Sequence, residues 1–264
     1  MIDLHSHILA GIDDGAASLD DSLALIQGSV DSGVVKVLAT PHIHLGTFDN
    51  DLKCIQQAFN KLTQHLASKN ISPTNTASTK ISSNKINSIK VSLAYAAEVR
   101  ICPEIMMLAN TNSLPFMGKW EGDNLLLLEF PHSHIPPGSE NLIDWLNKHN
   151  IRTMIAHPER NRDVWQCPEI LSSFRERGCL FQVTAASLLG DFGPLSKALA
   201  WEMIENNQVT LIASDMHNLK RRPSKMKEAF LAIGAECGVK LAEQLLIDTP
   251  NLIFESNPTI WVNQ

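Results

Sequence analysis

Short apolar runs alternate along the chain with longer stretches in which apolar residues recur every three or four positions. Several of the short runs are continuously apolar, which is typical of parallel strands covered on both faces. The runs comprise residues 2–4, 34–39, 91–97, 125–128, 152–156, 180–183 and 209–213. The spacing of three and four predicts amphipathic helices between the strands. A strand–helix order that repeats about seven times predicts an α/β fold.

The first predicted helix has recognisable ends. Ser18 is placed to cap its N-terminus with Asp21 three residues later, and Gly33 is placed to end it. A second amphipathic pattern runs from Phe48 to Leu66, and further helices fit 139–149, 163–177, 195–207 and 223–246. This order favours a TIM-like barrel, with a doubly wound sheet as the alternative.

Length and composition indicate one large domain. The chain has 264 residues, of which 44% are hydrophobic, enough for a substantial core. We expect a single domain over 1–264. Between Ser68 and Ser92 there is no acidic residue, and serine, threonine, asparagine and lysine dominate. This composition predicts an exposed, flexible insertion at 68–92.

Charge and cysteine usage exclude several classes of protein. The net charge is −6 and no basic stripe is present, which argues against binding along a nucleic-acid backbone. The five cysteines are scattered without a Cys-x-x-Cys pair, as in a reducing compartment. No secretion signal opens the chain, and no run approaches 18 apolar residues. We therefore expect a cytoplasmic protein with no membrane insertion.

Histidines and carboxylates follow most of the predicted strands. His5 and His7 end the first strand, and residues two apart in a strand point to the same side, so both imidazoles can reach one ion. Later strand ends carry Asp14, His42, Glu98, Glu129, His157, Asp215 and His217. In a barrel these ends share one face. Imidazole and carboxylate without thiolate suit manganese, iron or zinc in a hydrolytic site with several metal ions.

Each of these residues also has a structural interpretation. Asp14 fits a turn between glycines, Asp215 fits a helix cap, and Glu98 and Glu129 fit solvated strand ends. We expect three further histidines to be ordinary loop residues, namely His44, His132 and His134. These interpretations do not explain why so many ligand-type residues fall at one end of the predicted sheet.

Several motifs occur together in a characteristic order. They are Met1-Ile2-Asp3-Leu4-His5-Ser6-His7, Gly11-Ile12-Asp13-Asp14-Gly15, Thr40-Pro41-His42, Leu128-Glu129-Phe130-Pro131, Ala156-His157-Pro158-Glu159-Arg160 and Asp215-Met216-His217. Together they resemble the PHP (polymerase and histidinol phosphatase) superfamily. More closely, they resemble the bacterial metal-dependent protein-tyrosine phosphatases of capsule and exopolysaccharide loci. The resemblance spans the whole chain and implies a distorted (β/α)7 barrel.

The resemblance also implies three divalent ions, with manganese expected and iron or zinc as alternatives. The first ion would be bound by His5, His7, Glu98 and Asp215. The second would share Glu98 and add Glu129 and His157, and the third would take Asp14, His42 and His217. Arg160 and Arg222 match positions that hold phosphate, and with Asp215 and His217 they form the expected catalytic set. Arginine suits this role because its planar fork matches phosphate oxygens.

The chain departs from the family at two places. The segment 70–90 is longer, and Tyr95-Ala96-Ala97 precedes Glu98 where many relatives carry a glycine. The implied substrate is the phosphotyrosine-bearing tail of a bacterial tyrosine autokinase. The alternatives are a small-molecule phosphatase, such as a histidinol phosphatase, and a non-catalytic module that binds phosphorylated tails. A cysteine phosphatase is excluded, because no cysteine has an arginine six residues later.

Overall fold

The computed structural model describes residues 1–70 and 91–262. Residues 71–90, which form most of the predicted insertion at 68–92, lie outside the described residues. Of the rest of this segment, residues 68–70 end a helix and Ser92 begins a strand. The strands are β1 (Ile2–Ser6), β2 (Lys36–Ala39), β3 (His42–Ile43), β4 (Ser92–Tyr95), β5 (Glu98–Arg100), β6 (Gly118–Trp120), β7 (Asp123–Glu129), β8 (Ile151–Ala156), β9 (Leu180–Thr184), β10 (Leu211–Ala213) and β11 (Trp261–Val262).

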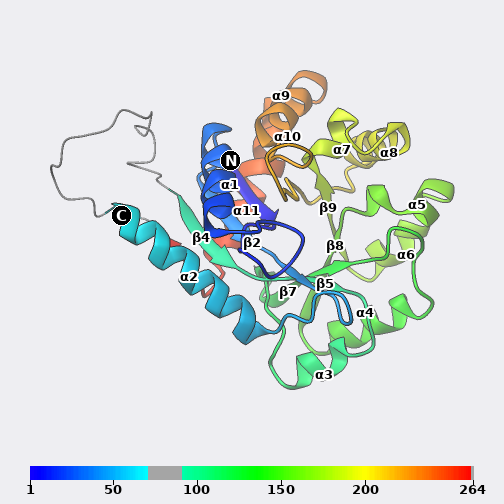
Figure 1. Cartoon of the computed structure of the whole chain (residues 1–264). Helices are drawn as coiled ribbons and strands as arrows, with labels where there is room; N and C mark the ends of the chain where they lie inside the picture. Colours follow the sequence, from blue (N-terminus) through cyan, green and yellow to red (C-terminus); the bar gives the residue numbers. More distant parts are fainter. Residues whose placement is uncertain (71–90, 263–264) are drawn as a thin grey trace, which may run out of the picture.

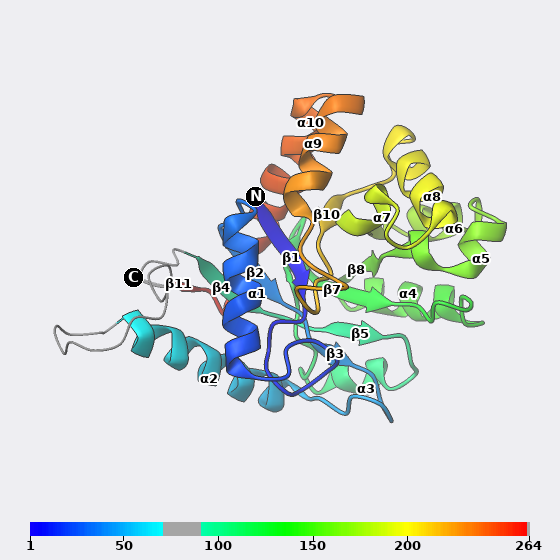
Figure 2. The ribbon, with the colours of Figure 1, turned by 45° about the horizontal axis from the view of Figure 1, so that its top comes forward.

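The helices lie around the outside of the strands (Figures 1 and 2). They are α1 (Leu19–Asp31), α2 (Leu52–Asn70), α3 (Ile105–Asn110), α4 (Ser139–Lys148), α5 (Arg162–Gln166), α6 (Ile170–Glu176), α7 (Ala185–Leu189), α8 (Pro194–Glu205), α9 (Met226–Glu236), α10 (Val239–Glu243) and α11 (Thr249–Glu255). A 3-10 turn spans Pro158–Arg160, and a π-helical turn spans Gln244–Asp248. Among the described residues, no helix is both long and apolar enough to cross a membrane.

Most strands pair in parallel with their neighbours in the sequence. One sheet has the order β1-β2-β4-β11 and the other the order β10-β9-β8-β7-β5-β3. β2 and β3 lie end to end around Pro41, as do β4 and β5 around residues 96–97, so each pair acts as one interrupted strand. Strand order thus follows chain order, which is typical of a (β/α) barrel. A doubly wound sheet instead reverses its order at a switch point.

The barrel is distorted where its last strand meets its first. The backbone N–H of Asp215 donates to the carbonyl of His5 at 2.8 Å, and that of His7 donates to the carbonyl of Met216 at 2.9 Å. Ser6 and Met216 form an isolated bridge rather than a continuous ladder, and the N–H of Ser214 donates to Asp3 Oδ1 at 2.9 Å. The residues after β10 therefore lie beside the end of β1, where both carry ligand-type side chains.

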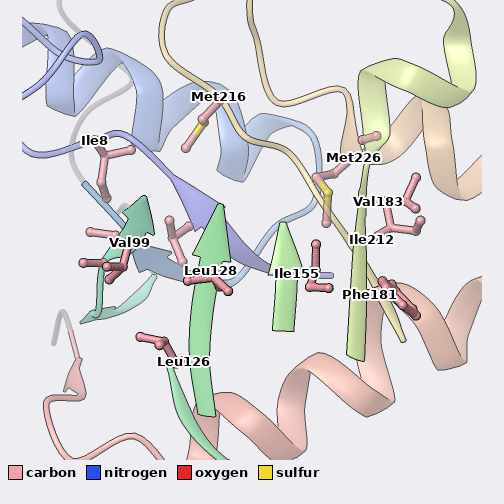
Figure 3. Close-up of a cluster of buried hydrophobic side chains, with 14 of the residues drawn as sticks. Ile8, Val99, Leu126, Leu128, Ile155, Phe181, Val183, Ile212, Met216 and Met226 are labelled. Atoms are coloured by element: carbon pink, nitrogen blue, oxygen red, sulfur yellow. The ribbon is translucent and has the colours of Figure 1, made fainter. Parts of the chain in front are cut away.

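Side chains along several strands alternate between two hydrophobic clusters. On β7, Leu126 and Leu128 belong to an outer cluster that packs against the helices. Figure 3 shows them with Ile155 beside the parallel arrows of β7 and β8. Leu125 and Leu127 belong to an inner cluster inside the barrel, which Ile253 and Phe254 of α11 and Met117 also join. The alternation follows from the two-residue period of a strand.

The predicted strands and helices are present, but several boundaries were wrong. The predicted helix 163–177 is two helices, α5 and α6, because Pro168 lacks an N–H and cannot continue the first. The predicted helix 223–246 is broken at Gly238 and continues as further turns to Glu255. The capping box of Ser18 and Asp21 is confirmed at the start of α1. The second helix begins at Leu52, so Phe48 lies in the preceding turn.

Candidate metal centre

Several ligand-type residues at the ends of the strands continue the inner side of their strand. Glu129 follows Leu125 and Leu127 at intervals of two, and Asp215 follows Leu211 and Ala213 in the same way. At this end of the barrel a cavity of about 160 Å³ opens. It is lined by Asp14, His42, His44, Phe48, Glu98, Arg100, Glu129, His132, His157, Arg160, Asp215 and Arg222.

Four atoms at the floor of this site form a tetrahedron in which five of the six edges are 3.2–3.4 Å long, and all four atoms lie within 4.8 Å of one another. The Nε2 atoms of His5 and His7 are 3.3 Å apart. Glu98 Oε2 lies 3.2 and 3.4 Å from these nitrogens, and Asp215 Oδ1 lies 3.4 and 3.3 Å from them. A regular tetrahedron with edges of about 3.3 Å has its centre about 2.0 Å from each corner, which is the length of a metal–nitrogen or metal–oxygen bond. The first predicted group therefore fits one metal ion.

Three carboxylate oxygens at this site accept no hydrogen bond within the described part of the chain, although His42 Nδ1 lies 3.0 Å from Glu98 Oε2 and Arg100 Nε lies 3.1 Å from Glu129 Oε2. Glu98 Oε2 and Asp215 Oδ1 are buried and accept no hydrogen bond from any described residue, and the same holds for Glu129 Oε2. Burying an ionised carboxylate without compensation costs several kcal/mol. Converging unsatisfied oxygens are thus the feature that a divalent ion would satisfy.

The histidines are oriented by groups behind them. His5 Nδ1 lies 2.8 Å from Gln182 Oε1, His7 Nδ1 lies 2.8 Å from Asp13 Oδ2, and His217 Nδ1 lies 3.0 Å from the Asp215 carbonyl. A proton on each Nδ1 leaves the Nε2 lone pair facing the site, as is common for metal-binding histidines. The sequence analysis missed Asp13 and Gln182. Asp13 stands beside Asp14 in the Gly-flanked motif, whereas no local signal marks Gln182.

The other two predicted groups adjoin the first. Glu98 Oε1 lies 2.7 Å from His157 Nε2, so Glu98 faces both groups, and Glu129 Oε2 lies 3.8 Å from His42 Nδ1. On the other side, Asp14 Oδ1 lies 3.4 Å from His42 Nε2 and 3.3 Å from His217 Nε2. The structure thus brings all nine predicted ligands together at one end of the barrel. Of the four converging sets of ligand-type atoms among the described residues, one is identical to the first predicted group, and each of the other three includes a residue from outside its predicted group, namely His7, His132 or His42.

One of these additional residues is His132. Its ring offers a nitrogen within reach of Glu129 and His157, and its Nε2 lies 3.0 Å from Arg160 Nη2. His132 is therefore more than an ordinary loop residue, contrary to the expectation. His44 lines the cavity but belongs to none of the converging sets. Both follow strand ends, and that signal was present in the sequence.

Arg160 and Arg222 both point at Asp215. A guanidinium nitrogen of each hydrogen-bonds to Asp215 Oδ2, the oxygen that faces away from the tetrahedron. Both guanidinium groups also lie over the ring of Phe192, with centroid distances of 4.5 and 5.9 Å. Arg160 forms no hydrogen bond with Glu159 or Asp163, its neighbours in the sequence. Glu159 instead accepts from Ser187, and Asp163 accepts from the Ile135 N–H. Two positive groups therefore border the cavity.

The electrostatics of the site favour metal-binding forms of some ligands. Burial, with Arg160 nearby, lowers the pKa of His157 to about 3, and burial, with His7 nearby, lowers the pKa of His217 to about 4. Both imidazoles are therefore neutral near pH 7, as a ligand must be. Burial and the Glu98 carboxylate raise the pKa of Glu129 to about 7. A carboxylate beside another carboxylate is held as an anion only when positive charge is supplied.

Two site residues have unusual backbone conformations. His157 has φ 33° and Asp215 has φ 52°, both in the left-handed region that residues other than glycine rarely adopt. Such conformations cost of order 1–3 kcal/mol each and are concentrated at functional sites. Here they turn the chain sharply at the ends of β8 and β10.

Fold and site together define a class of protein, an α/β barrel whose strand ends carry imidazoles and carboxylates suited to divalent ions. The family model for capsular polysaccharide synthesis, CpsB/CapC, matches residues 1–255. The chain belongs to this family. It is 31% identical over 262 residues to the tyrosine-protein phosphatase YwqE of Bacillus subtilis (strain 168), covering 99% of this chain and 94% of YwqE.

Other comparisons agree. The chain is 26% identical over 263 residues to the tyrosine-protein phosphatase CpsB of Streptococcus pneumoniae, covering 96% of this chain and 98% of CpsB. A solved structure described under "Crystal structures of YwqE from Bacillus subtilis and CpsB from Streptococcus pneumoniae, unique metal-dependent tyrosine phosphatases" matches with a TM-score of 0.82 at 30% identity, covering 100% of this chain and 97% of that chain. The predicted family and fold are confirmed.

Proposed function

We propose that this chain hydrolyses phosphotyrosine in a protein and needs bound divalent ions to do so. The observation that carries the proposal is the tetrahedron formed by His5, His7, Glu98 and Asp215, with its buried carboxylate oxygens that accept no hydrogen bond from the residues that the structure describes. The names of the relatives support phosphotyrosine as the substrate. The full ligand set argues against a module that only binds phosphorylated tails.

Each part of the site has a role in this proposal. Bound ions would supply an activated water and neutralise charge on the phosphoryl oxygens. Arg160 and Arg222 would bind the phosphoryl oxygens, since a guanidinium can make two parallel hydrogen bonds to phosphate. Both now contact Asp215 Oδ2, so an arriving phosphate would compete with that carboxylate oxygen for their N–H groups. Asp13 and Gln182 would keep His7 and His5 in their tautomers.

The finer assignments are part of the same proposal. Three ions, with manganese preferred, would occupy the three predicted ligand groups, because imidazole-rich shells suit manganese better than magnesium. Residues 1–264 would form one domain. The substrate would be the phosphotyrosine-bearing tail of a tyrosine autokinase in the cytoplasm, which fits membership in a capsular polysaccharide synthesis family.

The test is to measure phosphate release from a phosphotyrosine peptide and from histidinol phosphate. Protein depleted of metal with a chelator and then dialysed should be inactive, and manganese should restore activity better than magnesium. A higher kcat/KM on the peptide supports the proposal, and a higher value on histidinol phosphate would replace it with the small-molecule phosphatase. Binding of the peptide without turnover at full metal occupancy would indicate the non-catalytic module, and full activity of the metal-free protein would refute the metal requirement.

A further inference from the structure

Phe48 is an unusual member of the cavity wall. Of the described residues that line the cavity, the other eleven are histidine, aspartate, glutamate or arginine, so Phe48 is the single hydrocarbon side chain. It is half-buried and belongs to neither hydrophobic cluster. Its apolar periodicity with Leu52 suggested a helix position, but the helix begins four residues later. Its place in the fold is therefore not explained by core packing.

The turn that carries Phe48 is fixed to the strand that supplies a predicted ligand. The N–H of Phe48 donates to the carbonyl of His44 at 2.7 Å, and the N–H of His44 donates back at 3.0 Å. Asn50 Nδ2 donates to the carbonyls of Ile12 and His42 at 2.7 and 2.8 Å. These bonds hold the turn over the end of β3.

The ring of Phe48 is also held in orientation. It lies parallel to the imidazole of His42, with an interplanar angle of 9° and centroids 5.4 Å apart. That distance corresponds to offset stacking, which leaves part of the ring uncovered. A flat apolar surface thus borders a cavity whose other lining side chains are histidine, aspartate, glutamate and arginine.

The geometry points to Phe48 as the residue that recognises the aromatic ring of the substrate. This inference rests on the proposed function. In a phosphotyrosine the ring stands directly next to the phosphate, whereas a phosphoserine has only a methylene there. With the phosphoryl group between Arg160 and Arg222, the adjoining ring would lie near the cavity wall and stack on Phe48. Aromatic pairs gain from burial and from offset stacking, so Phe48 would favour aryl over alkyl phosphates.

The inference is tested by the ratio of kcat/KM on phenyl phosphate to that on phosphoserine, with manganese present. Phe48→Ala should lower this ratio about 10-fold or more, mainly through the aryl substrate, because it removes both the stacking and the apolar contact. Phe48→Leu, which keeps an apolar side chain, should lower it less, and Phe48→Trp should retain it. Leu45→Ala is the matched control, since Leu45 is exposed in the same turn and does not line the cavity.

Binding gives a second measurement that does not depend on turnover. Calorimetric titration should show that Phe48→Ala weakens phenylphosphonate about 10-fold while leaving methylphosphonate unchanged. Equal losses on aryl and alkyl compounds, or loss of metal from Phe48→Ala, would show that Phe48 only supports His42 and would overturn the inference. Wild-type protein that is inactive on every phosphate at full metal occupancy would instead refute the proposed function itself.

Discussion

The inside of the barrel has two ends with opposite chemistry. At the start of the strands, Leu125 and Leu127 pack with Ile253 and Phe254 in a closed apolar cluster. At the other end, only two residues beyond Leu127, Glu129 is buried among other ionisable groups. On β7, both ends lie on the same inner face of one strand.

Because the two ends differ in this way, the residues of one strand that stabilise the fold are distinct from the residues that form the site. Burial of apolar surface stabilises the first end by about 25 cal/mol for each Å² removed from water. Burial of carboxylates destabilises the second end by several kcal/mol per charge unless opposite charge compensates. Arg160 and Arg222 supply part of that charge at Asp215, and bound ions would supply the rest. The apolar end thus provides the rigid support on which the polar end is held.

The largest effect is expected from removing a predicted ligand. Asp215→Asn and His42→Ala should each lower kcat by at least about two orders of magnitude, in the range seen when one preorganised electrostatic group is removed. Asparagine tolerates the left-handed backbone at this position, so Asp215→Asn should still fold. Steady-state kinetics at measured metal occupancy would test both variants, and a wild-type rate for either would remove that residue from the ligand set.

At the apolar end we expect the reverse, a loss of stability without a loss of kcat. Leu125 is fully buried in the inner cluster. Leu125→Ala should lower the free energy of unfolding by about 2–5 kcal/mol, through lost burial and the cavity that remains. Urea denaturation would measure this change, while kcat per folded molecule should stay near that of the wild type. A large loss of kcat without a loss of stability would show that the two ends are not separable.

The affinity for metal should depend on pH through Glu129. Its pKa is raised from 4.5 to about 7, so folded metal-free protein keeps this proton below about pH 7. The contribution of Glu129 to stability is present below pH 4.5 and is lost as the pH rises through 7. An ion that binds the carboxylate displaces the proton, so the Glu129 proton by itself should lower the affinity about tenfold for each pH unit below 7.

Calorimetry in two buffers of different ionisation enthalpy would count the protons that manganese releases at each pH. The Glu129→Gln variant is the control and should release about one proton fewer than the wild type at pH 6, because glutamine carries none to displace. Equal proton release by both proteins would contradict the assignment of this titration to Glu129.

A smaller effect on catalysis is expected from Arg160→Lys. Lysine keeps the charge but cannot form two parallel hydrogen bonds, so kcat/KM should fall about tenfold and part of the loss should appear in kcat. Metal content should not change, because Arg160 is not a predicted ligand. Kinetics with parallel metal analysis would decide the matter, and an unaltered kcat/KM would return Arg160 to a structural role at Asp215.

The smallest effect is expected at the N-cap of α1, which belongs to neither end of the barrel interior. Ser18 accepts a hydrogen bond from the N–H of Asp21 and begins α1. Ser18→Ala should lower the free energy of unfolding by about 1 kcal/mol and leave kcat unchanged. Urea denaturation would measure it. A change in kcat would show that α1 couples to the metal centre through residues 13–17.

The sequence by itself determined the strands, most of the helices and the ligand-type residues at the strand ends. These are local properties, because a strand has a period of two and a helix a period near 3.6. The same periodicity misplaced Phe48 in α2 and joined α5 to α6, since it does not include the hydrogen bonds of a turn or the effect of Pro168.

Only the tertiary structure decided which groups meet. Gln182 lies 177 residues from His5 along the chain yet orients its ring, and Arg160 reaches Asp215 across 55 residues. Such pairs depend on the order of the strands and on the bonds that join the end of β10 to β1. No periodic pattern encodes them, because each contact is set by the packing of the whole barrel.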